Sequence, residues 1–260
     1  MEQNPFIYLR GLKHAAFTVF CVAEGQKSYY DPQFRVYAPY SSGQQVKRSI
    51  MDKIVETLNE EPSPVSFYFD VDKKGALKEG EVLSICNPEY VDQLIGGWMR
   101  TPKGGAEKAV KRRSPLSISA MTPLHPLLAA IPTENISFDR SDRPGVHKVV
   151  VRDADGTPLT EEQISELLSG MDRSLYRKWI PDNKRATGLF VYDVAIDLRR
   201  LFTVSTNQLE PEISSETFEK LKNEGWKTVK TVFGEALLMP ENRRNKIIPA
   251  IADALIDWRI

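Results

Sequence analysis

The sequence predicts an α+β fold of the ferredoxin-like type, built from split βαβ units. Two long strand-like segments, residues 7–23 and 187–202, are the first observation behind this prediction. A helix-like segment follows each of them later in the chain, and irregular segments with prolines and glycines separate the two. The chain shows no internal repeat, so its 260 residues are expected to form one domain with insertions.

The first part of the chain is predicted to run from strand to loop to helix. Segment 7–23 ends in a β-branched and aromatic run, so we expect one long strand that can bend at Gly11. After a turn-rich stretch at 24–40, Ser41 or Ser42 can act as the N-cap of a helix whose apolar residues recur every four positions. The helix is expected to end near Asn59. Its apolar positions are Val46, Ile50, Ile54 and Leu58.

The middle of the chain is predicted to consist of strands joined by irregular loops. Segments 65–71 and 114–120 have the composition of strands, and 81–86 can be another short one. Glycine pairs at 96–97 and 104–105 mark a loop between them.

The last part is predicted to alternate strands and helices. Segment 146–152 is an expected strand, followed by an Asp-Gly turn signal at 155–156. Thr160 and Gln163 match a capping box for a helix that ends near Leu168. The remaining expected elements are the strand at 187–202, a helix at 215–223, a strand at 226–239 and a last helix after Pro240 that Pro249 kinks or interrupts.

Composition excludes several classes of protein. Lys plus Arg and Asp plus Glu both number 35, so the net charge is zero and no global basic excess indicates nucleic acid. No apolar window reaches the roughly 18 residues of a membrane span, so no membrane partner is expected. Cys21 and Cys86 lie in apolar segments and are expected to be buried, reduced thiols of a cytoplasmic protein, with a disulfide between them as the alternative.

Residues suited to catalysis are sparse. The three histidines show no metal-ligand spacing, the cysteines form no CxxC pair, and no Walker, GxSxG or GxGxxG motif occurs. Asp70 and Asp72 alternate at a strand end and can hold a divalent metal, although a solvated pair is the commoner meaning. We therefore predict no catalytic residue, no metal site and no cofactor, and a protein that is not an enzyme.

Basic residues gather between positions 100 and 113. Six of them accompany a single acid, Glu107, which leaves a local surplus of five positive charges. The neighbouring glycines let a phosphate approach the backbone, and such a run supplies sequence-independent affinity for nucleic acid. A solvated basic loop explains the charges equally well. The six residues are Arg100, Lys103, Lys108, Lys111, Arg112 and Arg113.

A second candidate is the start of the helix that follows residue 41. A helix N-terminus presents free amide donors and a partial positive charge to an anion, and donor side chains follow at once. The alternative is an ordinary capped helix with a polar outer face. The residues are Ser42, Gln44, Gln45, Lys47 and Arg48. Three aromatic residues, Trp98, Phe138 and Phe233, can stack on bases or belong to the core.

Several segments, taken in order, resemble one family and together cover most of the chain. They are FIYLRGLKHAAFTVF followed by SGQQVKRSIMDKIVE, the loop at 94–97, KRRSPLSISAMTPLHP, ENISFDR at 134–140 and GLFVYDVAIDLRRLF at 188–202. They resemble the Cascade backbone proteins, the Cas-seven family of CRISPR-associated RAMP proteins, which is related to DevR, in its type I branch. The resemblance implies an RNA-recognition-motif-like palm with inserted finger and thumb elements, with approximately 24–40, 86–187 and 203–226 lying outside the palm.

The resemblance also implies a function. Copies of the chain would stack head to tail along a CRISPR guide RNA, beside other Cascade subunits, and present the guide to a target nucleic acid. A head-to-tail contact builds an open helical filament when the rotation from one copy to the next does not close a ring. By matching position, the five residues of the helix start become candidate contacts of the guide backbone. Lys111, Arg112 and Arg113 form a second set, and Arg10, Lys13 and His14 a weaker third.

Two other functions are left open. In type III relatives a loop aspartate cuts the target RNA, and Asp31 lies in roughly that region. A metal-dependent ribonuclease subunit that uses Asp31, or the pair Asp70 and Asp72, is therefore one alternative. The other is an interaction scaffold whose basic loop contacts an acidic partner and not RNA.

Overall fold

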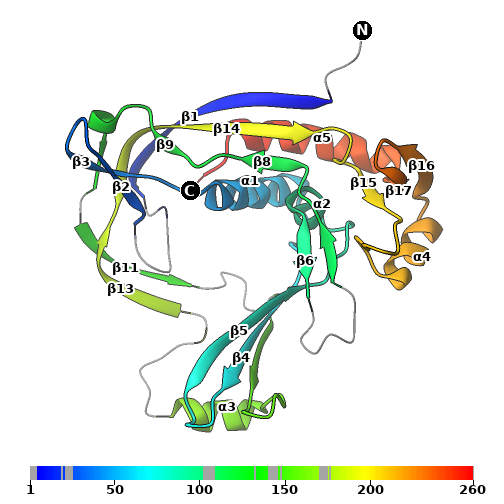
Figure 1. Cartoon of the computed structure of the whole chain (residues 1–260), viewed down its shortest axis with the longest axis horizontal. Coiled ribbons are helices and arrows are strands. Elements are labelled where there is room, and N and C mark those ends of the chain that lie inside the picture. The colour runs from blue at the N-terminus through cyan, green and yellow to red at the C-terminus, as the bar shows by residue number, and fades with distance from the viewer. Residues whose placement is uncertain are drawn as a thin grey trace. The chain divides into compact units, whose positions relative to one another are not determined.

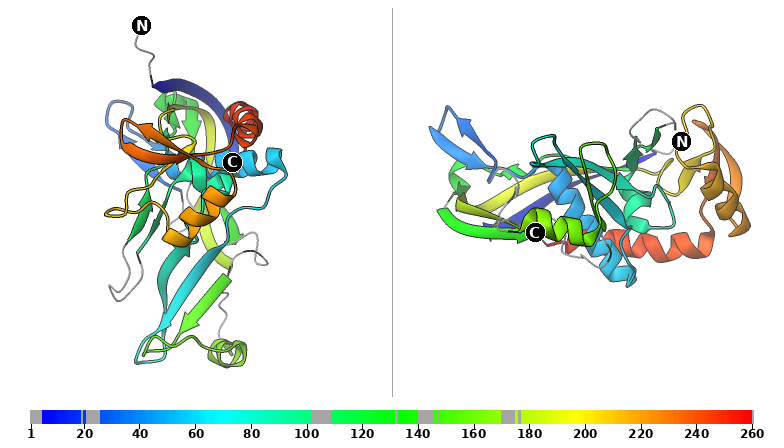
Figure 2. Two further views of the ribbon diagram at one scale, coloured as in Figure 1. Left: turned by 90° about the vertical axis from the view of Figure 1, so that its right-hand side faces the viewer. Right: turned by 90° about the horizontal axis from the view of Figure 1, so that it is seen from below.

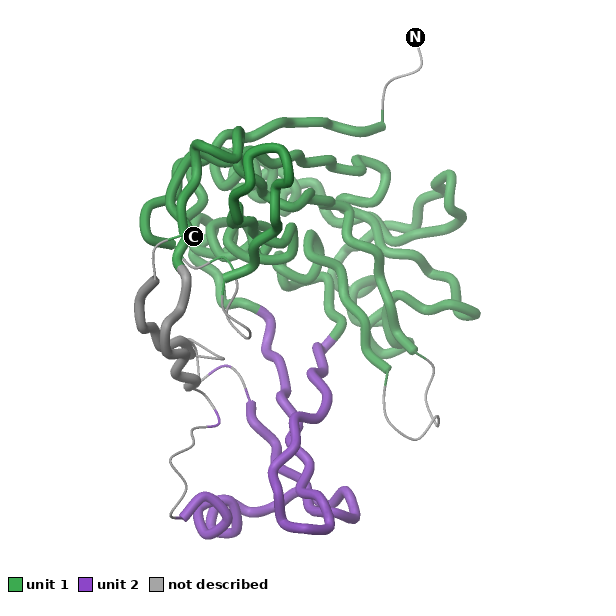
Figure 3. The backbone as a smooth tube through the Cα atoms, turned by 60° about the vertical axis from the view of Figure 1, so that its left-hand side comes forward, with its two compact units in different colours: residues 1–62, 86–135, 181–260 green, residues 63–85, 136–180 purple. Residues whose placement is uncertain are grey.

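The computed structural model describes residues 5–18, 20, 26–101, 109–131, 133–139, 146, 148–169, 175 and 177–259, of which 133–139 and 177–184 are described by their backbone alone. The chain divides into two compact units, which Figure 3 colours separately. Unit 1 comprises Met1–Pro62, Cys86–Asn135 and Pro181–Ile260, and unit 2 comprises Ser63–Ile85 and Ile136–Ile180.

The central sheet of unit 1 is built on the two long strands. β1 (Phe6–Thr18) and β14 (Ala186–Asp197) run antiparallel and pair along most of their length. The two long strands are confirmed over 7–18 and 187–197, whereas 198–202 is not part of the strand and residues 19 and 21–23 lie outside the described residues. The structure adds that the two strands are neighbours. Three short strands pair with β14 as well: β8 (Leu116–Ile118), β9 (Thr122–Pro123) and β10 (Ala129–Ala130).

Two helices cover one face of this sheet. α1 (Gly43–Leu58) and α5 (Glu241–Ile256) pack against each other and share a buried core with β14 (Figures 1 and 2). Strand alternation directs Phe190, Tyr192 and Val194 into that core. The residues between them, and those opposite them on β1, therefore lie on the other face of the sheet, away from the helices.

Shorter elements complete unit 1. They are β2 (Ser28–Asp31), β3 (Val36–Pro39), α2 (Val91–Gly96), β6 (Trp98–Arg100), β7 (Val110–Arg112), the 3-10 helix η1 (Pro126–Leu128), β15 (Thr203–Ser205), α4 (Ser215–Asn223), β16 (Lys227–Thr231) and β17 (Gly234–Leu238). β2 pairs with β3 and β6 with β7, while β15, β17 and β16 form a sheet in that order. This sheet and α4 lie beyond the carboxyl end of β14 (Figure 1). A further pair joins β11 (Thr133–Asp139) to β13 (Arg177–Lys184), and the residues of each of these strands are divided between the two units.

Unit 2 is a three-stranded sheet with one helix. β4 (Val65–Val71) lies between β12 (Lys148–Arg152), which is parallel to it, and β5 (Leu77–Ser84), which is antiparallel. Arg152 ties the strands together: its guanidinium is 2.7 Å from Asp70 and 3.0 Å from Glu81. The predicted capping box is confirmed at the start of the helix, α3 (Glu161–Leu168).

Three sequence expectations need correction. The turn-rich stretch 24–40 contains the hairpin β2–β3, and the expected single strand at 226–239 is the hairpin β16–β17. The second hairpin can turn because Gly234 adopts a left-handed φ of 105°. The pairing of β1 is regular at Gly11, and its register shifts later, between Ala15 and Thr18. Gly11 is required for a different reason, since the ring of Tyr192 fills the space where a Cβ would lie.

The α+β class is confirmed, because helices accompany several antiparallel sheets. The single domain, the RNA-recognition-like palm and the boundaries of its insertions stay predictions. Cys86 is a buried free thiol, as expected, whereas Cys21 lies outside the described residues. Within the described part of the chain, no helix is both long and apolar enough to cross a membrane.

Candidate nucleic-acid interface

The start of α1 is held in place by the backbone of the neighbouring strands. Ser42 is the N-cap, and its side chain accepts a hydrogen bond from the amide of Gln45 at 3.4 Å. Ser41 forms two backbone hydrogen bonds with Met121, of 2.9 and 3.0 Å. Gly43 packs so closely on the carbonyl of Ile118 that no side chain fits there. The Ser-Gly pair is thus explained by packing, and it fixes where the first turn of the helix presents its amide groups.

Three of the donor side chains at this helix start differ in their exposure. Gln44 and Arg48 are exposed and lie one turn apart on the same face of α1. Arg48 is 3.7 Å from Asp52, an exposed pair that holds the guanidinium only weakly. Gln45 is half-buried. Gln44 and Arg48 are therefore the members of this set that can reach a ligand outside the protein.

Lys47 is directed inward. Its ammonium donates to the carbonyl of Gly96 at 3.0 Å and to the Ser114 hydroxyl at 2.5 Å. Burial lowers the pKa of Lys47 to about 8, and the nearby positive charge of Arg112 contributes to the same lowering. Lys47 joins α1 to the end of α2 and to the segment after β7, so it organises the surface that Gln44 and Arg48 present.

The pH dependence of stability should report the buried Lys47. Because its folded-state pKa is below the ordinary 10.5, the unfolded chain binds more protons between these two values, and stability rises with pH from about 8 upward. Relative to Lys47→Met, the free energy of unfolding of the wild type should rise by about 2 kcal/mol across this window, after allowance for solvent screening. Urea titrations at a series of pH values measure it. The same replacement at the exposed Lys246 is the control, and an unchanged pH profile in Lys47→Met would contradict the prediction.

Arg112 is also directed inward, although it belongs to the predicted basic cluster. Its side chain is 1% exposed and lies 3.8 Å from Glu212. The guanidinium donates to the carbonyls of Leu94, Arg200 and Thr203, the last two at 2.7 and 3.1 Å. Burial lowers the pKa of Arg112 to about 10, which still leaves it charged at neutral pH. It fastens β7 to α2 and to β15 and offers no free donor to a ligand.

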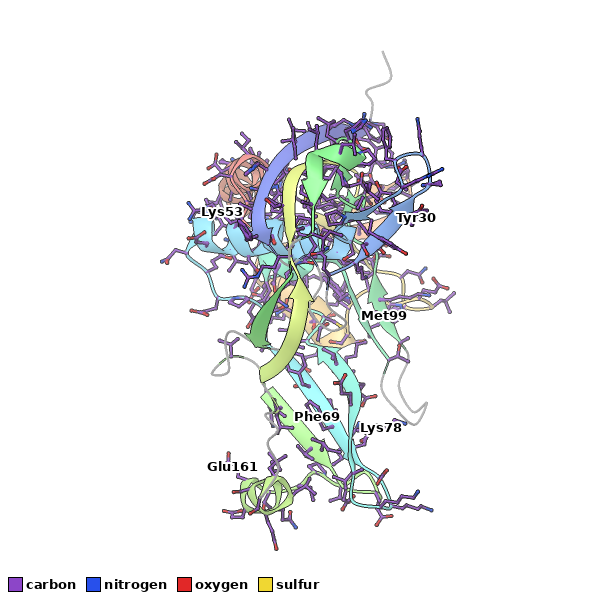
Figure 4. All side chains as sticks on the ribbon, turned by 90° about the vertical axis from the view of Figure 1, so that its left-hand side faces the viewer. Tyr30, Lys53, Phe69, Lys78, Met99 and Glu161 are labelled. Atoms are coloured by element: carbon purple, nitrogen blue, oxygen red, sulfur yellow. The ribbon has the colours of Figure 1, made fainter. Side chains whose placement is uncertain are left out.

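The neighbours of Arg112 point the other way, because side chains alternate along β7. Lys111 is 55% exposed, 3.8 Å from Glu210, and shares the outer side of the β6–β7 hairpin with Met99 (Figure 4). Arg113 is exposed, and Arg100 is half-buried and has contacts of its own. Lys103 and Lys108 lie outside the described residues.

The third predicted set, on β1, is divided between the two faces of the sheet. Arg10 is paired across the strands with Asp193, at 2.7 Å, and both side chains are mostly exposed. His14 is exposed on this same face. Lys13 points to the helix side, where its ammonium donates to the Trp258 carbonyl and lies 4.5 Å over the indole ring; burial lowers its pKa. Arg10 and His14 therefore face away from α1 and do not share a surface with Gln44 and Arg48.

The aromatic candidates also separate. Trp98 belongs to the core: it is 7% exposed, and its indole nitrogen donates to the Glu212 carbonyl at 2.6 Å. The side chain of Phe138 lies outside the described residues. Phe233 is 46% exposed at the turn of the β16–β17 hairpin. Sequence reasoning missed its partners, Arg199 and Arg200, because both were assigned to the strand that in fact ends at Asp197.

The aspartates of the nuclease alternative are used in local structure. The Asp31 carboxylate accepts the amides of Gln33 and Phe34, at 2.9 and 3.0 Å, and so closes the β2–β3 turn. Asp70 binds Arg152, and Asp72 accepts two amides of the turn that follows β4. Among the described residues no three His, Cys, Asp or Glu side chains gather where they could hold a metal ion.

The chain has similarity to solved structures but not to family models or curated proteins. Among solved structures, the chain is similar to a chain of a "CRISPR RNA-guided surveillance complex, pre-nicking", with a TM-score of 0.38 and 10% sequence identity. The similarity covers 75% of this chain and 65% of that one, so this chain spans less than two thirds of the length of that neighbour.

Proposed function

We propose that this chain is a guide-RNA-binding structural subunit, which oligomerises along CRISPR RNA as the backbone of a type I interference complex. The observation that carries the proposal is the Ser42–Gly43 start of α1, with Gln44 and Arg48 exposed on the turn that it fixes. It stands at the point of the chain where the sequence resembles the Cascade backbone proteins. In this role the subunit does not cut RNA.

The chemistry of this surface suits a sugar–phosphate backbone. The helix start offers amide donors and the positive end of a dipole, and Arg48 offers a guanidinium that can hold a phosphate through two hydrogen bonds. Lys111 and Arg113 supply a second group of exposed cations, and Lys47 joins the two segments through Ser114. Contacts of this kind do not depend on base identity, as a subunit that carries many guides requires.

The proposed partners follow from the same role. They are the guide RNA, the target nucleic acid paired to it, further copies of the chain arranged head to tail, and the other Cascade subunits. All of these would be met in the cytoplasm, and the ferredoxin-like palm with its finger and thumb insertions would carry the contacts.

Co-purification tests the assembly. When the chain is expressed with a CRISPR array and its partner subunits, we expect a large particle that contains RNA of uniform length. Its ultraviolet absorbance should be high at the nucleic-acid maximum relative to the protein maximum, as for any particle that contains nucleic acid. Absence of RNA from such a preparation would overturn the proposal. Magnesium-dependent cutting by the wild type that Asp31→Ala abolishes would favour the nuclease alternative, and equal binding to heparin and RNA would favour the interaction scaffold.

Arg48→Glu should weaken the binding of single-stranded RNA by the purified chain roughly tenfold. The slope of the logarithm of the binding constant against the logarithm of the salt concentration should become shallower by about 0.7 for each phosphate that the variant no longer neutralises. Fluorescence anisotropy at several salt concentrations gives both values. Lys246→Glu, which makes the same charge change on the exposed side of α5, is the matched control. If both variants lose affinity equally, the effect is one of net charge, and α1 is not the binding surface.

A further inference from the structure

An open hollow lies beside the β15–β17 sheet, and of the residues that the proposed function uses it shares only Arg113. It is small and open to solvent, so it encloses no ligand, and a phosphate or a base would lie across its mouth. All its lining residues belong to unit 1. They include Arg113, Arg200, Thr203, Ser205, Thr231 and Phe233.

An exposed aromatic ring forms one wall of the hollow. The Phe233 ring is 46% exposed although it is large and apolar, and its neighbour Val232 is more exposed still, at 77%. The turn that carries it is rigid, because the Thr231 hydroxyl accepts the amide of Phe233 at 3.1 Å and donates to the Gly234 carbonyl at 2.9 Å. The ring is therefore held at the surface by the hairpin, and the part of it that neighbouring side chains leave exposed is available to a partner.

Two guanidinium groups lie over this ring. Arg200 is 3.7 Å and Arg199 is 5.0 Å from the centre of Phe233. A guanidinium that stacks on a ring keeps its N–H groups in its own plane, where they can bind a phosphate. The ion pairs of Arg200 are long, 3.7 Å to Glu212 and 3.9 Å to Asp197, so they do not occupy its donors with short hydrogen bonds.

The charge at the hollow favours an anion. Three arginines line it, against the carboxylates of Glu212 and Glu235. Glu212 is already engaged, since it accepts the amide of Ser205 at 2.8 Å and lies beside Arg112 and Arg200. No carboxylate of the described residues lies within ion-pair distance of Arg113. The Lys111 amide donates to the Pro211 carbonyl at 3.1 Å and so ties the strand before Arg113 to the segment that carries Glu212.

We propose that this hollow binds one nucleotide of a single-stranded nucleic acid, with its phosphate between Arg113 and Arg200 and its base against Phe233. A phosphate matches the guanidinium groups and the nearby hydroxyls, and a base matches the half-exposed ring. An acidic polypeptide would match the charges but leave the ring unused. The inference rests on the proposed function for the source of the strand and shares Arg113 with its second group of cations, but it uses none of the residues at the start of α1.

Binding of a short fluorescein-labelled oligouridine to the full chain, followed by anisotropy, tests the site. Phe233→Ala should weaken binding by about tenfold, the usual effect of losing one stacked base, with the salt dependence unchanged. Arg113→Gln should weaken binding and also lower the salt dependence. Phe233→Trp should retain the affinity, which separates stacking from a general effect on the hairpin. Val232→Ala, on the same turn, is the control, and thermal unfolding of each variant shows that it folds.

The outcomes separate this inference from the proposed function. If Phe233→Ala and Arg113→Gln bind as the wild type does, while Arg48→Glu does not, the hollow is not a nucleotide site and the proposed function stands. If both variants of the hollow lose affinity for the oligomer but the wild type never co-purifies with CRISPR RNA, the nucleotide site stands and the proposed function fails. Competition by poly-glutamate that equals competition by unlabelled oligouridine would assign the hollow to an acidic polypeptide instead and overturn the inference.

Discussion

Replacing Arg112 with methionine should lower the free energy of unfolding of unit 1 by roughly 3–5 kcal/mol, the usual cost of removing one partner of a buried ion pair. Three backbone carbonyls, the buried one of Leu94 and the partly buried ones of Arg200 and Thr203, would be left without this donor at once. The Glu212 side chain, only 12% exposed, would keep its charge without its nearest buried cation. Methionine fills a similar volume, so the effect measures the missing polar interactions more than a cavity.

Tryptophan fluorescence during urea unfolding measures the free energy of unfolding of unit 1, the unit that contains Arg112. Three of the four tryptophans, Trp98, Trp226 and Trp258, belong to unit 1. Arg113→Met is the matched control on the next residue, and because Arg113 is exposed its effect should be below about 0.5 kcal/mol. A double-mutant cycle with Glu212→Gln should show a coupling energy of about 1 kcal/mol or more. Equal destabilisation at Arg112 and Arg113 would mean that the buried network does not hold β7 in place.

Local signals were sufficient to predict several elements. α1 begins after Ser42 and ends before Asn59, as its cap and its apolar spacing predict. The capping box of Thr160 and Gln163 likewise places α3 correctly. These signals lie within a few residues of the element that they define, so they need no knowledge of the partners in space.

Hairpins with apolar turns could not be predicted in the same way. The β16–β17 turn consists of Val232 and Phe233, residues that are typical of strands, and only Gly234 marks it. The segment therefore looks like one continuous strand, and only its pairing with β15 and with itself reveals the reversal. The exposure of Phe233, on which the nucleotide site depends, follows from that reversal.

The candidate site could be located from the sequence but not resolved into exposed and buried members. Arg112 and Arg113 are adjacent and chemically identical, and only the packing of β7 against α2 and β15 directs the first inward. The sequence held a signal for the inward direction of Lys47, and it was missed. The residue one turn later, Met51, belongs to the buried face of α1, and residues four apart share a helix face. A basic residue beside such a position is a candidate for internal hydrogen bonding before it is a candidate for RNA.

Trp258→Ala should destabilise unit 1 by about 3–5 kcal/mol, the range for truncating a buried aromatic residue. The Trp258 side chain is 1% exposed and meets Tyr192 edge-on, with ring centres 5.4 Å apart. Its indole nitrogen donates to the Tyr192 hydroxyl at 2.7 Å, and the ammonium of Lys13 lies over the ring. Tyr192 in turn fills the space above Gly11. Trp258 therefore holds β1 to β14 through two residues of β1 at once.

The size and location of this effect can be measured together. Trp258→Phe keeps an aromatic ring but loses the hydrogen bond to Tyr192, so it should cost about 1–2 kcal/mol, and Arg259→Ala, next to it and exposed, should cost little. Since Trp226 and Trp98 remain as fluorescent probes, urea unfolding gives the free energies. Hydrogen exchange gives the location: the amides of β1 near Lys13 should lose protection in Trp258→Ala more than those of β15–β17. Uniform loss of protection across unit 1 would show that Trp258 supports the core as a whole, and that Lys13 is not what couples it to β1.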